Sequence, residues 1–189
     1  MARRVYLRRL TASVLAVGAV LALAACGNKP ELQTEGDTEG TYLNVGPLTY
    51  QVQISRQLNP RDTEDQTYLQ GIVPSEARLG TEETWFGIFI LALNEGDKDR
   101  FAASNFAIED TQDHIYRPIP QSPRNPFTYH ARVVPAGERI PKVDSVASEG
   151  VIAGSLLLFK LPRTTLDNRP LEFVVSDQLH HSGRVKLDV

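Results

Sequence analysis

Apolar and polar residues alternate along two segments of the chain, and this pattern predicts β-strands. Within Tyr42–Ser55, the apolar residues from position 48 onward occupy every second place, with Thr, Gln or Ser between them. A period of two is typical of a strand that buries one face. Near the other terminus, charged residues alternate with Val and Leu over 184–189. That segment predicts an edge strand whose charges point outward.

Three further segments are apolar on both faces and predict buried strands. They are Trp85–Leu93, Val151–Leu161 and Leu171–Val175, and the second of them should stop at Pro162. A buried helix is the alternative for 85–93. The segment is short for a helix, however, and its aromatic and β-branched residues favour a strand. We expect one face of this strand to lie in the core and the other to be covered by a loop or a neighbouring element.

Turn-forming residues separate these strands. Asn105–Glu109 and His114–Tyr116 flank an acidic turn, and this arrangement predicts a hairpin. Two longer excursions, 56–84 and 117–150, show no continuous pattern. The second contains six prolines, which lack a backbone donor and therefore prevent a continuous sheet. We expect at most one short strand in it, near 129–134.

Together these segments predict an all-β protein. Six to eight short strands separated by turns, with no amphipathic helix after the N-terminal region, are typical of an immunoglobulin-like antiparallel β-sandwich. The sandwich domain should cover residues 42–189. A length of this order is enough to bury a core without disulfides or a structural metal.

The first 26 residues have the pattern of an export signal. Four arginines within positions 3–9 precede an apolar run over 10–22, and Leu23-Ala24-Ala25-Cys26 follows. This ending resembles a bacterial lipobox. The resemblance implies a signal peptide over 1–25 that is cleaved before Cys26, a diacylglycerol on the cysteine sulfur, and a location at the extracytoplasmic face of a membrane. A single transmembrane anchor is the alternative, but the run is shorter than the ~20 residues that span a bilayer.

Composition narrows the function further. Residues 26–41 are polar, with one large apolar residue, and predict a flexible tether. The chain has 20 Lys and Arg against 23 Asp and Glu, scattered among one another, so no basic patch indicates nucleic-acid binding. Cys26 is the only cysteine, which excludes an intrachain disulfide, cysteine-based zinc sites and thiol catalysis.

Once the strands are placed, the chain resembles a known family over roughly 45–176. The resemblance lies in the strand 85–94 followed by Gly96-Asp97, in 105–110 running into 114–118, and in Gly154–Pro162. These motifs resemble the DUF4352-type extracellular immunoglobulin-like domains. The resemblance implies a sandwich fold on a lipid-anchored bacterial protein. One departure is Asp113, which stands where the family usually has glycine; an aspartate can adopt the left-handed backbone of such a turn, but less freely than glycine.

Candidate metal and catalytic groups are few. His180 and His181 with Asp177 could supply metal ligands only if a turn brought them together, because neighbouring residues on a strand point to opposite faces. The Asp-rich turns lack the order of an EF-hand loop. No Gly-x-Ser-x-Gly motif accompanies a serine nucleophile. We therefore expect no metal, no cofactor and no catalysis.

Two functions remain open from the sequence. The first is a membrane-held binding or structural module of the cell envelope, with a possible protein partner in the envelope, whose contacts would be Arg124, Phe127 and Tyr129 in the proline-rich excursion. The second is an envelope enzyme or small-molecule carrier whose site lies in the excursions 56–84 and 117–150. The proline-rich excursion could alternatively serve only to cover the apolar outer face of the 85–93 strand.

Overall fold

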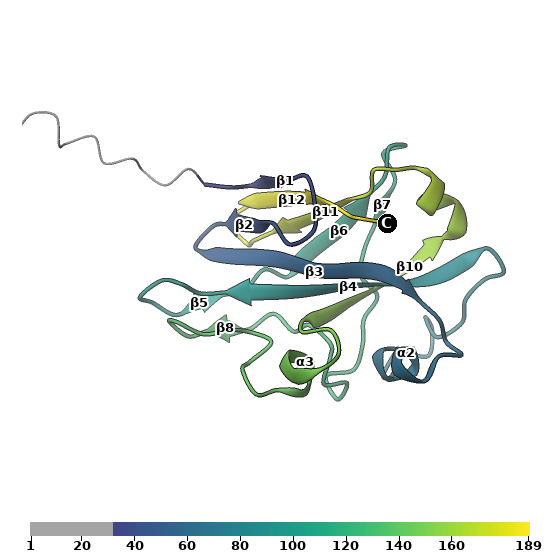
Figure 1. Cartoon of the computed structure of the whole chain (residues 1–189), viewed down its shortest axis with the longest axis horizontal. Coiled ribbons are helices and arrows are strands. Elements are labelled where there is room, and N and C mark those ends of the chain that lie inside the picture. Colours follow the sequence, from purple (N-terminus) through teal and green to yellow (C-terminus); the bar gives the residue numbers. More distant parts are fainter. Residues whose placement is uncertain (1–31) are drawn as a thin grey trace, which may run out of the picture. The chain divides into compact units, whose positions relative to one another are not determined.

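The structure, a computed structural model, describes residues 32–189 of the 189-residue chain. The expected signal peptide over 1–25 and the expected lipid site at Cys26 lie outside the described residues. Two β-sheets pack face to face (Figure 1), which confirms the predicted all-β sandwich class.

The first sheet has five strands in the order β1-β12-β11-β6-β7. All of its pairings are antiparallel except that of β1 with β12, which is parallel. The strands are β1 Glu35–Gly36, β6 Asn105–Glu109, β7 Ile115–Tyr116, β11 Glu172–Ser176 and β12 Ser182–Lys186.

The second sheet has the order β10-β4-β3-β2 and is antiparallel, with β9 added beside the end of β4. Two further strands, β5 and β8, pair only with each other. The strands are β2 Tyr42–Val45, β3 Leu48–Leu58, β4 Glu83–Leu93, β5 Arg100–Phe101, β8 Val133–Val134, β9 Arg139–Ile140 and β10 Ser155–Pro162.

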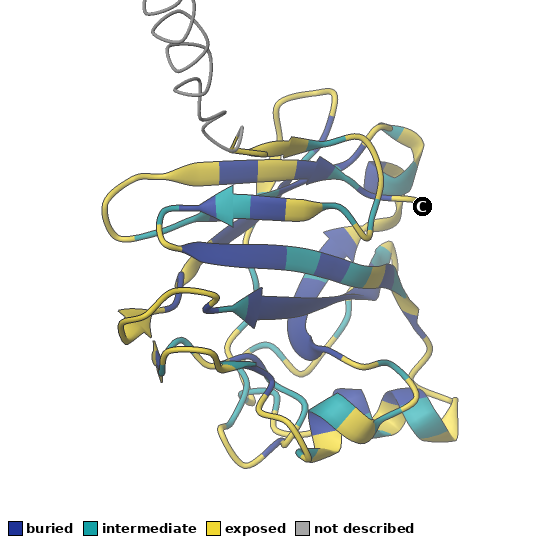
Figure 2. Ribbon diagram, turned by 60° about the vertical axis from the view of Figure 1, so that its left-hand side comes forward, coloured by how far each residue is buried: buried dark blue, intermediate teal, exposed yellow. Residues whose placement is uncertain are grey.

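Strand β4 runs through the centre of the second sheet and is buried along almost its whole length, as its sequence predicts. Its side chains at Phe86, Ile88 and Ile90 face the first sheet and share the main core with Phe159 and Phe173. Trp85 and Phe89 point to the opposite face, where they join a second apolar cluster with Tyr68. Figure 2 shows this continuous burial along the central strands.

The second cluster exists because the two long excursions lie over the outer face of β4 and β10. The first excursion contains a short helix, α2 Thr63–Tyr68, which is not among the elements predicted from the sequence. Asp62 caps it by accepting hydrogen bonds from the backbone of Glu64 and Asp65. At six residues the helix is too short to show a periodic apolar pattern, so it depends on its cap and on Tyr68, which is fully buried.

The second excursion is irregular, as expected, apart from β8, β9 and a helix, α3 Val146–Glu149. Its expected strand near 129–134 is limited to β8. The apolar segment 151–161 forms a strand only from Ser155, because Val151 lies outside the sheet and is 83% exposed. A 3-10 helix, η2 Arg163–Asp167, follows the strand after Pro162.

Two other expectations differ from the structure for a common reason. Strand β12 was expected at a sheet edge, yet β1 pairs alongside it, with Glu35 opposite Arg184. Strand β1 itself falls inside the segment 26–41 that was expected to be a flexible tether. Lys186 bonds to Asp37 at 2.7 Å, and Thr38 donates to Asp188 at 2.7 Å. These polar bonds hold the segment in place, and no large apolar side chain takes part in them. The hydropathy of the segment therefore gives no indication that it is ordered.

Within residues 32–189, no helix is long and apolar enough to cross a membrane.

Candidate functional site

Tyr129, one of the three expected contacts, lies in the main core and is 7% exposed. Its hydroxyl donates to the carbonyl of Ala103 at 2.8 Å, and the amide of the same Ala103 donates to the hydroxyl of Tyr50 at 2.6 Å. Burial raises the pKa of Tyr50 to about 12 and that of Tyr129 well above its ordinary value. Tyr129 is therefore mainly a structural residue of the core, and its small exposed fraction corrects the expectation that it is an exposed contact.

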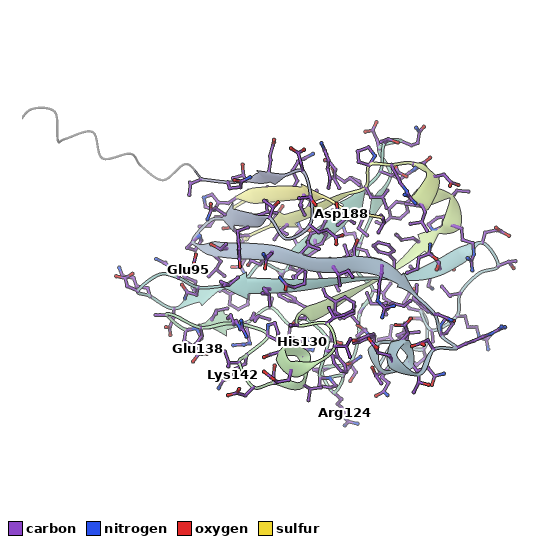
Figure 3. The ribbon with its side chains drawn as sticks, in the orientation of Figure 1. Glu95, Arg124, His130, Glu138, Lys142 and Asp188 are labelled. Atoms are coloured by element: carbon purple, nitrogen blue, oxygen red, sulfur yellow. The ribbon has the colours of Figure 1, made fainter. Side chains whose placement is uncertain are left out.

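Phe127 and Arg124 have different surroundings. The ring of Phe127 is half-buried against the second cluster and meets Tyr68 edge to face, with ring centroids 4.9 Å apart. Arg124 is exposed at the surface of the excursion, and its side chain points away from the domain (Figure 3). Of the three expected contacts, the structure leaves only Arg124 fully available. Phe127 serves mainly as cover, which is the alternative that the sequence left open.

Side-chain amides join the two excursions into one layer over β4 and β10. Asn125, 4% exposed, donates to the carbonyls of Tyr68 at 3.2 Å and Gln70 at 2.9 Å, while its oxygen accepts from the backbone of Phe127. Gln121 donates to the same two carbonyls at 2.8 and 3.2 Å. These bonds satisfy carbonyl groups at the end of α2 that have no partner within the helix.

A groove of about 370 Å³ opens between the two sheets where the second excursion crosses from one to the other. Ile119 bonds to the carbonyl of Leu158 as the chain arrives at β10, and Tyr129 bonds to the carbonyl of Leu156 as the chain leaves it. These two crossings form the walls. The groove is lined by Ser104 to Phe106, Arg117 to Gln121, Thr128 to Ala131 and Leu156 to Leu158.

The charge in the groove is positive or neutral. Arg117 and the exposed His130 line it, and no aspartate or glutamate does. The Arg117 guanidinium donates to the side-chain oxygen of Asn105 at 2.7 Å and to the carbonyl of Phe106 at 3.4 Å. Among the ion pairs of residues 32–189, none involves Arg117. The arginine is thus held in place by neutral acceptors and keeps its charge available for an anionic group.

The two hairpins of the first sheet use the same local motif, an aspartate followed four residues later by a histidine. Asp110 accepts from the backbone of Gln112 and His114 and from the His114 ring at 3.0 Å. Asp177 accepts from the backbone of Leu179 and His181 and from the His181 ring at 2.7 Å. The third residue of each turn, Asp113 or His180, has a left-handed backbone. Asp113 thus adopts the conformation for which the resembled family usually has glycine.

The aspartates in these hairpins have structural roles. Burial alone would raise the pKa of Asp110, but the hydrogen bonds from His114, Asn168 and Gln112 outweigh it and hold the pKa well below 3.8. The pKa of Asp177 is likewise lowered against its burial by the bonds from His181 and Leu179. Across residues 32–189, no three metal-binding side chains gather into a group.

Comparison with known proteins supports the fold. No family model matches the chain, and no curated protein does. The yjhA protein from Bacillus subtilis has 12% identity and a TM-score of 0.51, with 80% of this chain and 99% of that one covered. This likeness concerns the fold alone.

Two other solved structures have lower TM-scores. The lipoprotein candidate ycdA from Bacillus subtilis has 9% identity and a TM-score of 0.46, and the match covers 78% of this chain but 38% of ycdA. An uncharacterized beta-sandwich protein from Clostridium difficile 630 has 9% identity and a TM-score of 0.45, with 85% and 99% covered.

The groove around Arg117 was not found by sequence reasoning. Arg117 follows the predicted hairpin strand directly, and Asn105 begins the strand before it. The pairing of these two strands places residues 105 and 117 on neighbouring backbones. Only a fixed hairpin register could have shown this proximity, and the register depends on the turn conformation at Asp113.

Proposed function

We propose that this protein is a lipid-anchored, extracytoplasmic binding module of the bacterial cell envelope, and that it belongs with the DUF4352-type domains it resembles. Leu23-Ala24-Ala25-Cys26 after an arginine-rich start supports the anchor. The described domain begins at Leu32, six positions after Cys26, so the proposed lipid would hold the folded domain close to the membrane surface.

The groove around Arg117 is the observation that carries the binding role. A concave site with apolar walls and a few fixed polar groups is the usual form of a ligand site. Here Arg117 is positioned by Asn105, and no acidic side chain in the lining competes for its charge. The groove therefore suits a ligand with a carboxylate or another anionic group, such as an acidic peptide segment of an envelope protein.

The small-molecule carrier remains the second candidate because of the same groove. Small-molecule sites usually measure about 300 to 1,000 Å³, and this groove is at the lower end of that range. A carrier would bind a free small carboxylate as well as it binds an acidic peptide, whereas a peptide-binding module would require the longer ligand.

The anchor is tested by replacing Cys26→Ser and fractionating the cells. We expect the parent protein in the membrane fraction and the variant outside it, because two acyl chains give stable membrane attachment. A processed variant that stayed with the membranes would contradict the anchor.

The groove is tested by titrating the protein with an acidic hexapeptide, a basic hexapeptide and acetate. We expect the acidic peptide to bind and Arg117→Gln to weaken it by about tenfold or more, since a charge-assisted hydrogen bond contributes roughly 1.5 to 3 kcal/mol. Arg124→Gln is the matched control outside the groove and should bind like the parent. Equal weakening by both variants would indicate non-specific charge attraction instead of a site.

A further inference from the structure

One end of the sandwich brings together segments that lie far apart in the sequence. We call it the β2–β3 end, defined by the turn at 46–47, the hairpin tip 177–181, the loop 94–101 and the first described residues. The register places Thr49 of β3 opposite Leu93 of β4 and Asn105 of β6 opposite Ser176 of β11. The turn at Gly46 lies directly against Asp177 and His181. Strands of both sheets therefore begin or finish at this one end.

The chain also enters the domain here. Gln33 accepts a hydrogen bond from the backbone of Asn44 at 2.6 Å, and Thr34 accepts one from Arg184 at 2.9 Å. Leu32, the first described residue, precedes these contacts and is 69% exposed. Asn44 also bonds to Thr49 at 3.4 Å, which ties the entering segment to the start of β3.

Exposed apolar side chains accompany the entering chain at this end. Phe101 and Val133 are directly opposite each other on the β5–β8 pair and are 49% and 50% exposed. Leu179, at the tip of the 177–181 hairpin, is 75% exposed. In Figure 1 β5 and β8 lie at the same side of the domain as the beginning of β1. Single exposed apolar residues are normal on a protein surface, but a cross-strand pair, a hairpin-tip leucine and Leu32 at one end of the domain require a reason.

We propose that the β2–β3 end is a membrane-contacting surface, on which Leu32, Phe101, Val133 and Leu179 enter the interfacial region of the bilayer that holds the lipid anchor. This inference rests on the proposed lipid at Cys26. The six-residue interval from Cys26 to Leu32 spans at most about 20 Å, so the entry point cannot move far from the membrane. The end that carries Leu32 is therefore the one that meets the bilayer most often.

The charges of this end fit an apolar contact with the bilayer rather than an electrostatic one. Acidic and basic residues alternate up to the first residue of β5, at Asp97, Lys98, Asp99 and Arg100. Glu95, Glu138 and Lys142 lie at the same end of the second sheet (Figure 3). This mixed set gives no strong attraction to anionic lipids, which requires clustered Lys and Arg. We expect the contact to form on neutral phosphatidylcholine vesicles as well as on vesicles that contain phosphatidylglycerol.

The test uses the lipidated full-length protein in vesicles and exploits its single cysteine. A lipid thioether leaves Cys26 unreactive, so a thiol-specific fluorophore labels only a cysteine introduced elsewhere. Phe101→Cys and Leu179→Cys place the fluorophore at the β2–β3 end. Ile115→Cys is the matched control, because Ile115 is similarly exposed, at 56%. It pairs with Glu109, which lies at the opposite end of the first sheet from Ser176 and therefore from the β2–β3 end.

A quencher attached to the lipid chains then reports contact with the bilayer. We expect several-fold stronger quenching of the labels at 101 and 179 than of the label at 115, on both kinds of vesicle. The double variant Phe101→Asp with Leu179→Asp should abolish quenching of a label at Val133→Cys, while Ile115→Asp should leave it unchanged.

The outcomes separate failure of this inference from failure of the anchor. If the parent protein floats with the vesicles and takes no label but quenching is equal at 101, 179 and 115, the domain has no preferred contact and the inference is overturned. Quenching that appears only with phosphatidylglycerol would also overturn the apolar contact. If the parent protein takes the label at Cys26 or does not float, the anchor itself is wrong.

Discussion

The side-chain amide of Asn125 donates a hydrogen bond of 3.2 Å to the carbonyl of Tyr68, although the two residues are 57 positions apart. This bond joins the two long excursions at the point where helix α2 ends. Because Tyr68 and Phe127 meet edge to face in the cluster below, the excursions behave as one layer that seals the outer face of β4. The sandwich therefore has a third, partial layer built from segments that lack a regular pattern.

Removing the Asn125 amide should loosen this layer. Asn125→Ala leaves the buried carbonyls at the end of α2 with fewer donors, and we expect it to lower the free energy of unfolding by about 1 to 3 kcal/mol. The neighbouring Arg124→Ala removes an exposed side chain and should change stability by less than about 0.5 kcal/mol. Urea denaturation compares the two. Equal effects of both substitutions would show that Asn125 does not hold the layer.

The main core should depend strongly on Phe159. This side chain is fully buried between the sheets, and Phe159→Ala should cost about 3 to 5 kcal/mol because the cavity left behind cannot fully collapse. Val151→Ala, at a position 83% exposed, is the control and should be neutral. A thermal melt of the Phe159 variant within a degree or two of the parent would disprove the assigned core.

Because of Asp110, the free energy of unfolding should depend on pH in the acid range. Its pKa is lowered in the folded protein, so its contribution is fully present above the unfolded value near 3.8 and is lost as the pH falls below it. Asp110→Asn removes that contribution, and we expect a loss of about 1 to 3 kcal/mol at neutral pH. The difference from the parent should shrink below about pH 4. Asp113→Asn, at an exposed left-handed position that Asn tolerates, is the control and should change stability at neutral pH by less than about 0.5 kcal/mol.

A comparison of Gly46 with Gly40 separates the backbone strain of a positive φ from the steric collision of an added Cβ. Both have a positive φ, of 58° and 82°, so an alanine at either position should cost about 1 to 2 kcal/mol in backbone strain. A Cβ at Gly40 meets nothing within 4 Å, whereas one at Gly46 would collide with the Asp177 carboxylate. We expect Gly46→Ala to be clearly more destabilising than Gly40→Ala in chemical denaturation. Similar losses would mean that the hairpin moves aside without cost.

Strongly patterned segments could be predicted from sequence, and weakly patterned ones could not. The unbroken apolar run of 85–93 predicts β4 and its two covered faces correctly. The acidic turn before Ile115 likewise predicts a hairpin, which β6 and β7 form. In each case the deciding interactions are local, because the spacing of apolar residues and the residue types in a turn both act within a few positions of the chain.

The remainder depends on contacts between distant residues. Tyr129 has the composition of an interface residue, yet its hydroxyl has a buried partner at Ala103. A proline-rich context gives no indication of that partner. Strand β1 is polar and only two residues long. It pairs with β12, and the residues just after it are held by the Lys186–Asp37 ion pair and the hydrogen bond from Thr38 to Asp188. Neither feature leaves a periodic signal in the sequence.

The parallel pairing of β1 with β12 has a mechanical consequence. A pull on the chain ahead of Leu32 would act along β1, while the hydrogen bonds that hold this strand run across it to β12. Such a pull loads these bonds together, in shear, and must also break the link from Lys186 to Asp37. A strand pulled sideways would instead release its bonds one after another. The domain should therefore resist tension at its N-terminal attachment better than tension applied across its sheets.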